Sequence, residues 1–551
     1  MNPVVAAWIV GCHSAEVEAP EAVAGVADSV ASLGAVSALT RASLDLRGVR
    51  PTLSEIEAAE AAGETLSGGD PAAWLETVDT FLQDPRFGPR VRDMFAGIYL
   101  TRQDSYLYGA DDYGLVDPAA FVAAVGDEPL RVLSTLAEQD LPYTDIVTAD
   151  WTMADASLAA AAPVDYPDGA TGWQQVRYTD GRPAAGILAT NGFWWHYATS
   201  TSNLNRGRAN AISRVLLCFD YLSQPVEFDR SVDLLDADAV ADAVRTNPAC
   251  LSCHATLDPL ASYLYGFFPV PGDTAADAST WHAERTAFWR RATGVAPAYY
   301  GAPGESLGDL GLQIAADPRL TGCVTEQVYG LLHGREPDVD DTAALLSHRD
   351  DMLAGGGTLR ALFASVAGAD AYRLGADSAD VDDEGYAPKM LSVEQLGTVL
   401  EDLTGFRFTY QGYDLLGSDA YGVRTLAGGA DGIYSIRPGS SPSATGVLVH
   451  ERLAEAAAWY VAAQDHEHPG DARLFTEIDF TEIPSTGRSA MAEQLRALRL
   501  RLFGVRVDID GPEVTADLAL WAELYAVDGD PVAAWAGVLS VLLRDPAFLF
   551  Y

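Results

Sequence analysis

Residues 249–259 contain the side chains of this chain that are best suited to chemistry. Cys250, Cys253 and His254 form the pattern C-x-x-C-H, which is the spacing that attaches a c-type haem. On the first turn of a helix the two thiols lie close together, where they can reach the two vinyl groups of a porphyrin. The histidine that follows can then bind the iron as the proximal ligand. We therefore predict one covalent haem c, held by these three residues.

The same thiols could instead serve a zinc ion or a disulfide. Cys218 and Cys323 could complete a four-cysteine zinc site, although they are isolated in the sequence and form no second C-x-x-C. Cys250 and Cys253 could form a redox disulfide, although residues 247–249 are typical of a loop entering a helix and not of the strand-to-helix setting of a thioredoxin-like site. Haem c is our first interpretation, and these alternatives stay open.

Cys218 and Cys323 have a second interpretation of their own. Both fall on predicted helices with apolar faces, one before the haem motif and one after it. In an oxidising compartment a disulfide between them would tie these two helices together. Two buried free thiols are the alternative.

The sequence does not mark the second axial ligand of the iron. Small soluble cytochromes c use a methionine after the motif, but here the first one is Met352. The remaining candidates are side chains that can bind iron, namely His196, His282, Met94 and Met153. His196 ends an aromatic run at residues 193–196, and aromatic residues often wall a haem pocket, but such a histidine can equally be a packed core residue. An open sixth position would allow peroxide or small-ligand chemistry, whereas a filled one implies electron transfer.

The element before the motif contributes two arginines. Residues 205–222 are predicted to form a helix that is arginine-rich at its start. Arg206 and Arg208 could pair with haem propionates, and ordinary surface salt bridges are the alternative.

The surrounding elements are predicted to be mainly α-helical. Thr52 and Glu55 form a capping-box pattern, as do Ser392 and Gln395. Residues 174–183 are predicted to form a hairpin that turns at residues 180–181. The fold class is therefore mainly α and multi-domain, with a short β-hairpin region before a cytochrome-c-like haem-binding segment.

Composition shifts divide the chain into predicted parts. These are a lipoprotein signal and tether at 1–36, an N-terminal helical domain at 37–150, a cytochrome-c-like haem-binding region at 151–370, a linker at 371–388 and a C-terminal helical module at 389–551. The Gly/Asp-rich passage at 375–385 is the basis for the linker.

Several of these stretches occur in an order that resembles a known family. They are LDLRGVRPTLSEI at 44–56, DPRFGPRVR at 84–92, AGILATNGF at 185–193, NRGRAN at 205–210 with Leu217 and Cys218, ACLSCHATLDPL at 249–260, CVTEQVY at 323–329 and HGR at 333–335. They resemble large exported proteins of planctomycetes and myxobacteria that are built from cytochrome-c-like modules and have no established function. The C-terminal third is similar to a further module of that family through residues 391–406 and 545–551. The resemblance implies an exported, haem-binding, mostly helical protein, and it implies no particular reaction.

The chain is strongly acidic, with 78 acidic and 35 basic residues and a net charge of −43. Lys389 is its single lysine. Such a surface repels nucleic acid and anionic lipid, so we expect no nucleic-acid partner. A high-salt habitat explains this charge, and docking to a basic redox partner is the second interpretation. No apolar run approaches the roughly 18 residues that cross a bilayer.

Cys12 ends the short apolar run at residues 8–12 and resembles the lipidated cysteine of a bacterial lipobox. No Lys or Arg precedes the run and the apolar part is short; a start assigned too far downstream would explain both features. We predict lipidation of Cys12, with a buried cysteine as the alternative. The protein would then be exported to the periplasm or cell surface and anchored to the membrane by lipid. Export also suits haem c, because that haem is attached outside the cytoplasm.

We therefore predict a haem protein that exchanges electrons with a redox partner protein at a membrane surface. One alternative is a scaffold or binding lipoprotein whose C-x-x-C-H holds zinc or a disulfide. The other is a haem oxidoreductase or peroxidase-like enzyme.

Overall fold

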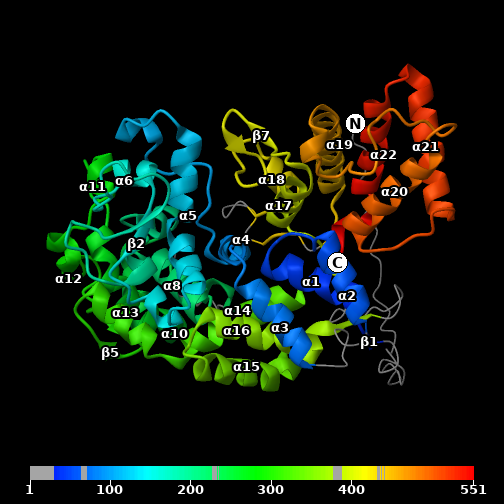
Figure 1. Ribbon diagram of the computed structural model, residues 1–551. Helices are drawn as coiled ribbons and strands as arrows, with labels where there is room; N and C mark the ends of the chain where they lie inside the picture. Colours follow the sequence, from blue (N-terminus) through cyan, green and yellow to red (C-terminus); the bar gives the residue numbers. More distant parts are fainter. Residues whose placement is uncertain are drawn as a thin grey trace, which may run out of the picture.

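The structure is a computed structural model, and it describes residues 30–63, 71–225, 232–233, 235–376, 388–430, 435, 437–439 and 441–551. The predicted lipidation site Cys12 and most of the predicted linker lie outside these residues. The described part contains 23 α-helices and four two-stranded antiparallel sheets (Figure 1). The predicted fold class is confirmed at this level, since the chain is mainly α. None of these helices is both long and apolar enough to cross a membrane.

The first 16 helices and three of the sheets belong to residues 30–376. The helices are α1 Ala35–Leu46, α2 Leu53–Ala62, α3 Pro71–Leu82, α4 Phe87–Tyr99, α5 Pro118–Glu138, α6 Ala156–Ala161, α7 Asn191–His196, α8 Arg206–Leu217, α9 Ala237–Thr246, α10 Pro248–Ala261, α11 Ala275–Ala278, α12 Trp289–Ala292, α13 Leu307–Ala315, α14 Pro318–His333, α15 Thr342–Ala354 and α16 Leu359–Gly368. The sheets pair β1 Val30–Ser32 with β6 Leu374–Ala376, β2 Thr152–Ala154 with β3 Gln174–Val176, and β4 Ala298–Tyr299 with β5 Ala302–Pro303.

The remaining seven helices and the last sheet belong to residues 388–551. The helices are α17 Val393–Thr404, α18 Val423–Leu426, α19 Ala444–Glu467, α20 Arg488–Phe503, α21 Pro512–Asp528, α22 Pro531–Leu543 and α23 Pro546–Leu549. The sheet pairs β7 Thr409–Tyr410 with β8 Tyr413–Asp414.

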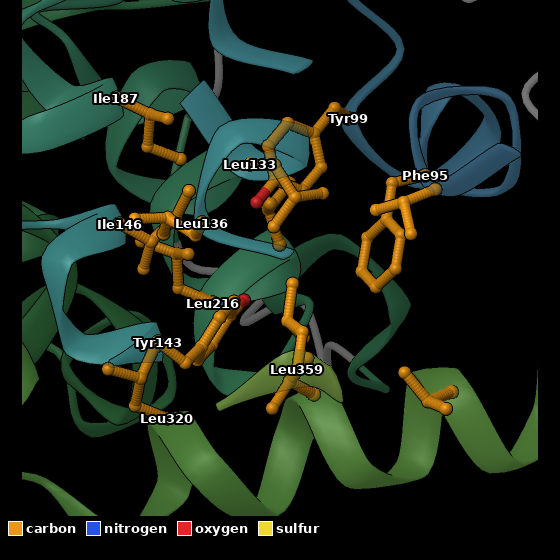
Figure 2. Packing of buried hydrophobic residues seen from close by; sticks show 14 of the residues in the cluster. Phe95, Tyr99, Leu133, Leu136, Tyr143, Ile146, Ile187, Leu216, Leu320 and Leu359 are labelled. Atoms are coloured by element: carbon orange, nitrogen blue, oxygen red, sulfur yellow. The ribbon is translucent and has the colours of Figure 1, made fainter. Parts of the chain in front are cut away.

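One buried core extends across the boundary that the sequence suggested at residue 150. Leu133 of α5, Leu216 of α8 and Leu359 of α16 belong to the same hydrophobic cluster, and Figure 2 shows them packed together. The parts predicted at 37–150 and 151–370 therefore contribute to one hydrophobic cluster. The physical reason is α5, which is buried along most of its length and packs against α4 and also against α7. We call residues 30–376 the large body.

The C-terminal segment has a second core, as the predicted module at 389–551 requires. Trp521 of α21 and Trp535 of α22 are fully buried there, and α19 packs along α22. Leu44 of α1 is the member of this core that comes from the N-terminal side of the chain. We call residues 388–551 the small body.

An ionic cluster joins the two bodies where the C-terminus meets α1 (Figure 1). The Lys389 ammonium pairs with the carboxylate of Asp45 and donates to the Leu332 carbonyl at 2.9 Å. Asp45 also accepts hydrogen bonds from the hydroxyls of Tyr372 and Tyr551, at 2.7 and 2.8 Å. The Asp45 side chain is 1% exposed and that of Lys389 is 9% exposed. The single lysine of the chain is thus buried in an ion pair between the two bodies.

The predicted hairpin at 174–183 is wrong in its partner. β3 pairs with β2, so that Thr152 lies opposite Val176 and Ala154 lies opposite Gln174. Asp180 instead accepts hydrogen bonds from Arg182 and from the Trp281 main chain, which ties its turn to a distant segment. A short β region does precede the haem motif, but a non-local pairing builds it.

Candidate haem-binding site

The C-x-x-C-H motif occupies the first two turns of α10. Asn247 caps this helix, because its side chain accepts a hydrogen bond from the Ala249 main-chain N–H at 2.9 Å. Pro248 follows at the first helical position, where proline loses no hydrogen bond. Cys250 and Cys253 are three residues apart on this helix and therefore lie on one face. The local sequence thus places both thiols on a rigid element.

Both motif cysteines are free thiols and are half-buried. Cys253 packs against the core of the large body, whereas the neighbouring Ser252 is exposed. Among the described residues, no group of three or more His, Cys, Asp or Glu side chains is arranged to hold a metal ion. The thiols are therefore accessible for covalent attachment without belonging to a preformed zinc cluster.

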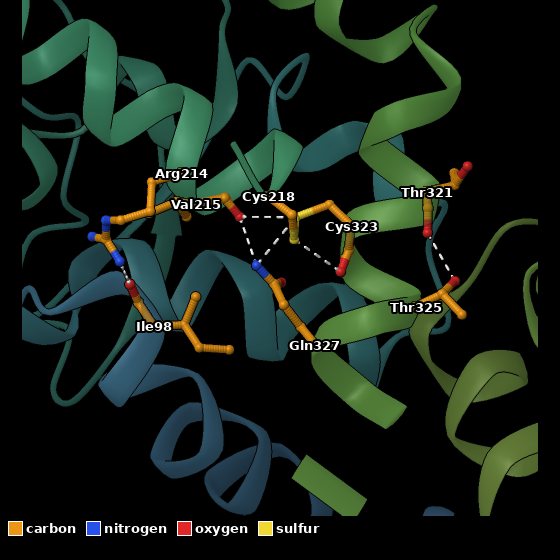
Figure 3. The surroundings of a disulfide bond; sticks show 8 residues. All are labelled: Ile98, Arg214, Val215, Cys218, Thr321, Cys323, Thr325 and Gln327. Carbon is orange, nitrogen blue, oxygen red and sulfur yellow. Dashed lines mark hydrogen bonds between the residues drawn. A yellow bond between two sulfur atoms is a disulfide. The ribbon is translucent and has the colours of Figure 1, made fainter. Parts of the chain in front are cut away.

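Cys218 and Cys323 form a disulfide, with their sulfur atoms 2.11 Å apart (Figure 3). The bond links the C-cap of α8 to α14. Gln327 of α14 donates to the Val215 carbonyl at 2.9 Å beside it. Because both sulfur atoms are used, these cysteines cannot supply the third and fourth thiolates of a zinc site at α10.

The imidazole of His254 is held from one side by a carboxylate. Its Nδ1 lies 2.9 Å from Oδ1 of Asp258, four residues further along α10. Its Nε2 has no hydrogen-bond partner among the described residues, and 23% of the side chain is exposed. One ring nitrogen is thus anchored and the other is available as a ligand.

Asp258 is itself fixed by Arg206 at the start of α8. The Arg206 Nε and Nη2 atoms lie 2.7 and 2.8 Å from Oδ1 and Oδ2 of Asp258, which is a bidentate pair. Burial alone would raise the pKa of Asp258, but the hydrogen bonds from Arg206 and His254 hold it below its ordinary value. A charged carboxylate is therefore maintained behind the histidine.

Arg208 does not reach the surface as a partner for propionates. It is buried and donates to the carbonyls of Tyr197 and Phe267, at 2.8 and 2.9 Å. Burial lowers its pKa to about 9. Since Arg206 is committed to Asp258, both arginines serve the protein interior near the site.

Two leucines in the segment between α8 and α10 are exposed. Tyr221 bonds Thr256 of α10 at 2.7 Å between the hydroxyl oxygens, and Leu222 beside it is 85% exposed. Leu235, just before α9, is 97% exposed, and α9 packs against α10. Two hollows of the protein, one lined by Asp465 and Arg473 and the other by Tyr106 and Phe121, include no residue of the motif.

His196 makes no hydrogen bond, ion pair or ring contact with α10. Its Nδ1 contacts the side-chain amide of Gln103, and its ring packs edge-on against Tyr197 at 4.2 Å. Burial and the nearby Arg214 charge lower its pKa to about 4, so the ring is neutral at pH 7. Its role as a distal ligand stays a prediction.

The other candidate ligands are placed as follows. His282 has both ring nitrogens engaged, at 3.0 Å from Glu284 and at 2.9 Å from the Asp277 carbonyl, which leaves none for iron. Met94 is buried in the core on α4, and Met153 lies in β2.

Sequence reasoning named the three motif residues and missed Asp258. The signal was present, because a carboxylate four residues after a helical histidine lies on the same face. The contribution of Arg206 to Asp258 could not be read in this way, because the two residues meet only through the packing of α8 on α10.

The chain matches no protein-family model, no curated protein and no solved structure.

Proposed function

We propose that this protein is a c-type haem protein that transfers single electrons. Cys250 and Cys253 would form the thioether bonds and His254 would bind the iron. The observation that carries the proposal is the donor set on α10. It consists of two free thiols on one helix face, followed by an imidazole whose Nδ1 is anchored and whose Nε2 is open. These are the donors that a c-type haem uses.

Attachment requires only an addition reaction at each cysteine. At Cys250 and Cys253 the Sγ–H bond would break, sulfur would bond the vinyl carbon next to the porphyrin ring, and the hydrogen would go to the terminal vinyl carbon. No electron leaves the system, so no oxidant is needed. When bound, the haem supplies a one-electron couple between ferric and ferrous iron.

The chain's own residues would orient and cover the cofactor. Asp258 holds His254 at its Nδ1, and Cys253 is fixed by its packing against the core of the large body. Because both motif cysteines are half-buried and 23% of the His254 side chain is exposed, a one-electron donor or acceptor protein could approach the haem edge. The net charge of −43 would favour a partner with a basic surface.

We further propose that the protein is exported and anchored by a lipid on Cys12, in the periplasm or at the cell surface. The disulfide between Cys218 and Cys323 supports export, because such bonds persist in oxidising compartments.

A pyridine haemochrome spectrum tests the proposal on the full chain, exported through a cytochrome maturation system. We expect a c-type spectrum that is lost in Cys250→Ala/Cys253→Ala. The matched control is Cys218→Ala/Cys323→Ala, which removes the same number of cysteines and should keep its haem. A colourless wild-type protein in good yield would overturn the proposal, and zinc analysis would then test the scaffold alternative.

A haem oxidoreductase with an open sixth position is the second candidate. It is favoured by the axial candidates themselves, since His282 has no free ring nitrogen and His196 makes no hydrogen bond, ion pair or ring contact with α10. A high-spin ferric spectrum that responds to added peroxide or cyanide would support this candidate. A low-spin spectrum that does not respond would leave electron transfer.

A further inference from the structure

We infer that Asp258 positions the imidazole of His254 for iron at Nε2 and makes it a more electron-rich ligand. The inference rests on the proposed function, since it assigns a role at the same site. Asp258 touches neither iron nor porphyrin, and it acts through His254.

The geometry fixes which nitrogen carries the proton. The carboxylate of Asp258 can only accept, so the contact at 2.9 Å requires a proton on Nδ1 of His254. In a neutral imidazole the lone pair then resides on Nε2. Asp258 is 5% exposed, so water cannot easily replace it in this contact. The ring is thereby held in the tautomer and orientation that metal binding needs.

Arg206 reduces the negative charge that the Asp258 carboxylate offers to His254. Its Nε donates at 2.7 Å to Oδ1, the same oxygen that accepts from His254. Two donors therefore share the charge of one oxygen. Removal of Arg206 leaves more charge for the hydrogen bond to His254, and removal of the carboxylate leaves less.

These two changes should move the haem reduction potential in opposite directions. A carboxylate that draws the Nδ1 proton makes the imidazole a stronger donor and stabilises ferric iron over ferrous iron. Asp258→Asn keeps the shape but replaces a charged acceptor by a neutral one, so the potential should rise. Arg206→Gln should lower it.

The experiment is a spectroelectrochemical titration of the full chain with covalently attached haem. We expect Asp258→Asn to shift the ferric–ferrous equilibrium at least tenfold toward ferrous iron, which is 59 mV for a one-electron couple. Arg206→Gln should shift it toward ferric iron. The control Asp220→Asn removes a carboxylate from the segment that contacts α10 through Tyr221, without touching His254, and should change the equilibrium less than twofold.

The outcomes separate the inference from the proposed function. Equal potentials in wild type, Asp258→Asn and Arg206→Gln, all carrying haem, would overturn the inference and leave the haem protein intact. An equal shift in Asp220→Asn would also overturn it, because charge alone would then suffice. If Asp258→Asn does not accumulate, Arg206→Gln decides by itself: a fall in potential supports the inference and an unchanged potential overturns it.

A protein that attaches no haem would contradict the proposed function, and the inference would then be judged on the apo chain. Nitrogen-15 chemical shifts of His254 report which ring nitrogen is protonated. We expect the Nδ1–H form in wild type and a mixture of tautomers in Asp258→Asn. A predominant Nε2–H form in wild type would overturn the inference.

Discussion

At the scale of single residues, three histidines are held neutral by burial. Burial lowers the pKa values of His196, His333 and His450 to about 4, from 6.5 in an open chain. His450 stacks in parallel on the ring of Phe548, and its buried Nε2 has no hydrogen-bond partner within the described ranges. The folded state therefore binds fewer protons at these rings than the unfolded state between pH 4 and 6.5.

This difference predicts how stability depends on pH. The contribution of each ring is fully present above pH 6.5 and is lost as the pH falls toward about 4. Urea unfolding of His450→Gln at several pH values should show a slope that is smaller by up to about 1.4 kcal/mol per pH unit in this window. An unchanged slope in His450→Gln would show that this ring is solvated in the native protein.

At the scale of elements, short capping patterns were predicted correctly. Thr52 with Glu55, and Ser392 with Gln395, form the reciprocal capping boxes that their spacing indicated. Such a motif is decided by four consecutive residues. The partner of β3 could not be predicted, because it depends on β2, which lies some twenty residues earlier in the chain. The same distinction applies to the candidate site. The contact of His254 with Asp258 is predictable because both lie on one helix, whereas the contact with Arg206 is not, because Arg206 belongs to another helix.

The N-cap of α10 allows a test of how the motif is presented. Asn247→Ala removes the acceptor of the Ala249 N–H and should weaken the first turn by about 1 kcal/mol. We expect a lower yield of attached haem, because the frayed turn no longer keeps both thiols on one face. The haem-to-protein absorbance ratio measures this. Asp236→Ala, at the N-cap of the neighbouring α9, is the control, and an equal loss there would contradict the role of the α10 cap.

The disulfide between α8 and α14 has a predictable energetic effect. It closes a loop with a sequence separation of 105 residues, and the loss of a bond of this kind costs about 2–5 kcal/mol. Cys218→Ala/Cys323→Ala should therefore unfold at a lower urea concentration than wild type. Reduction of the wild-type protein should lower the midpoint by a similar amount. A midpoint that reduction does not change would show that the two thiols are unlinked in solution.

At the scale of the whole molecule, composition suggested a division near residue 150 that the first hydrophobic core does not follow. In the sequence, the Gly/Asp-rich passage at 375–385 falls after the residues of the first core and, apart from Leu44, before those of the second. No comparable passage occurs near residue 150, but the change from helices to turns suggested a boundary there. No boundary forms there, because α5 is buried against α4, which precedes residue 150, and against α7, which follows it. Composition reports where a chain is exposed, and it does not report which elements share a core.

The junction of the two bodies depends on a pair of charges. Lys389→Met leaves Asp45 as an uncompensated charge with a 1% exposed side chain, and the loss of one partner of such a pair costs about 3–5 kcal/mol. Calorimetry should show a lower unfolding temperature for this variant. Lys389→Met/Asp45→Asn removes both charges and should recover part of the loss. A double variant no more stable than the single one would contradict the importance of the unpaired charge.

The position of Lys389 at this junction allows separation of the two bodies to be detected by acylation of its amine. The only side-chain primary amine of the protein is enclosed between its two bodies, so a reagent that acylates lysine has no accessible side chain to modify while the bodies remain together. Once they separate, the amine of Lys389 becomes available, and each molecule that has opened carries one additional adduct. Acylation of Lys389 therefore reports separation of the two bodies, and intact-mass measurement gives the fraction of molecules that have opened.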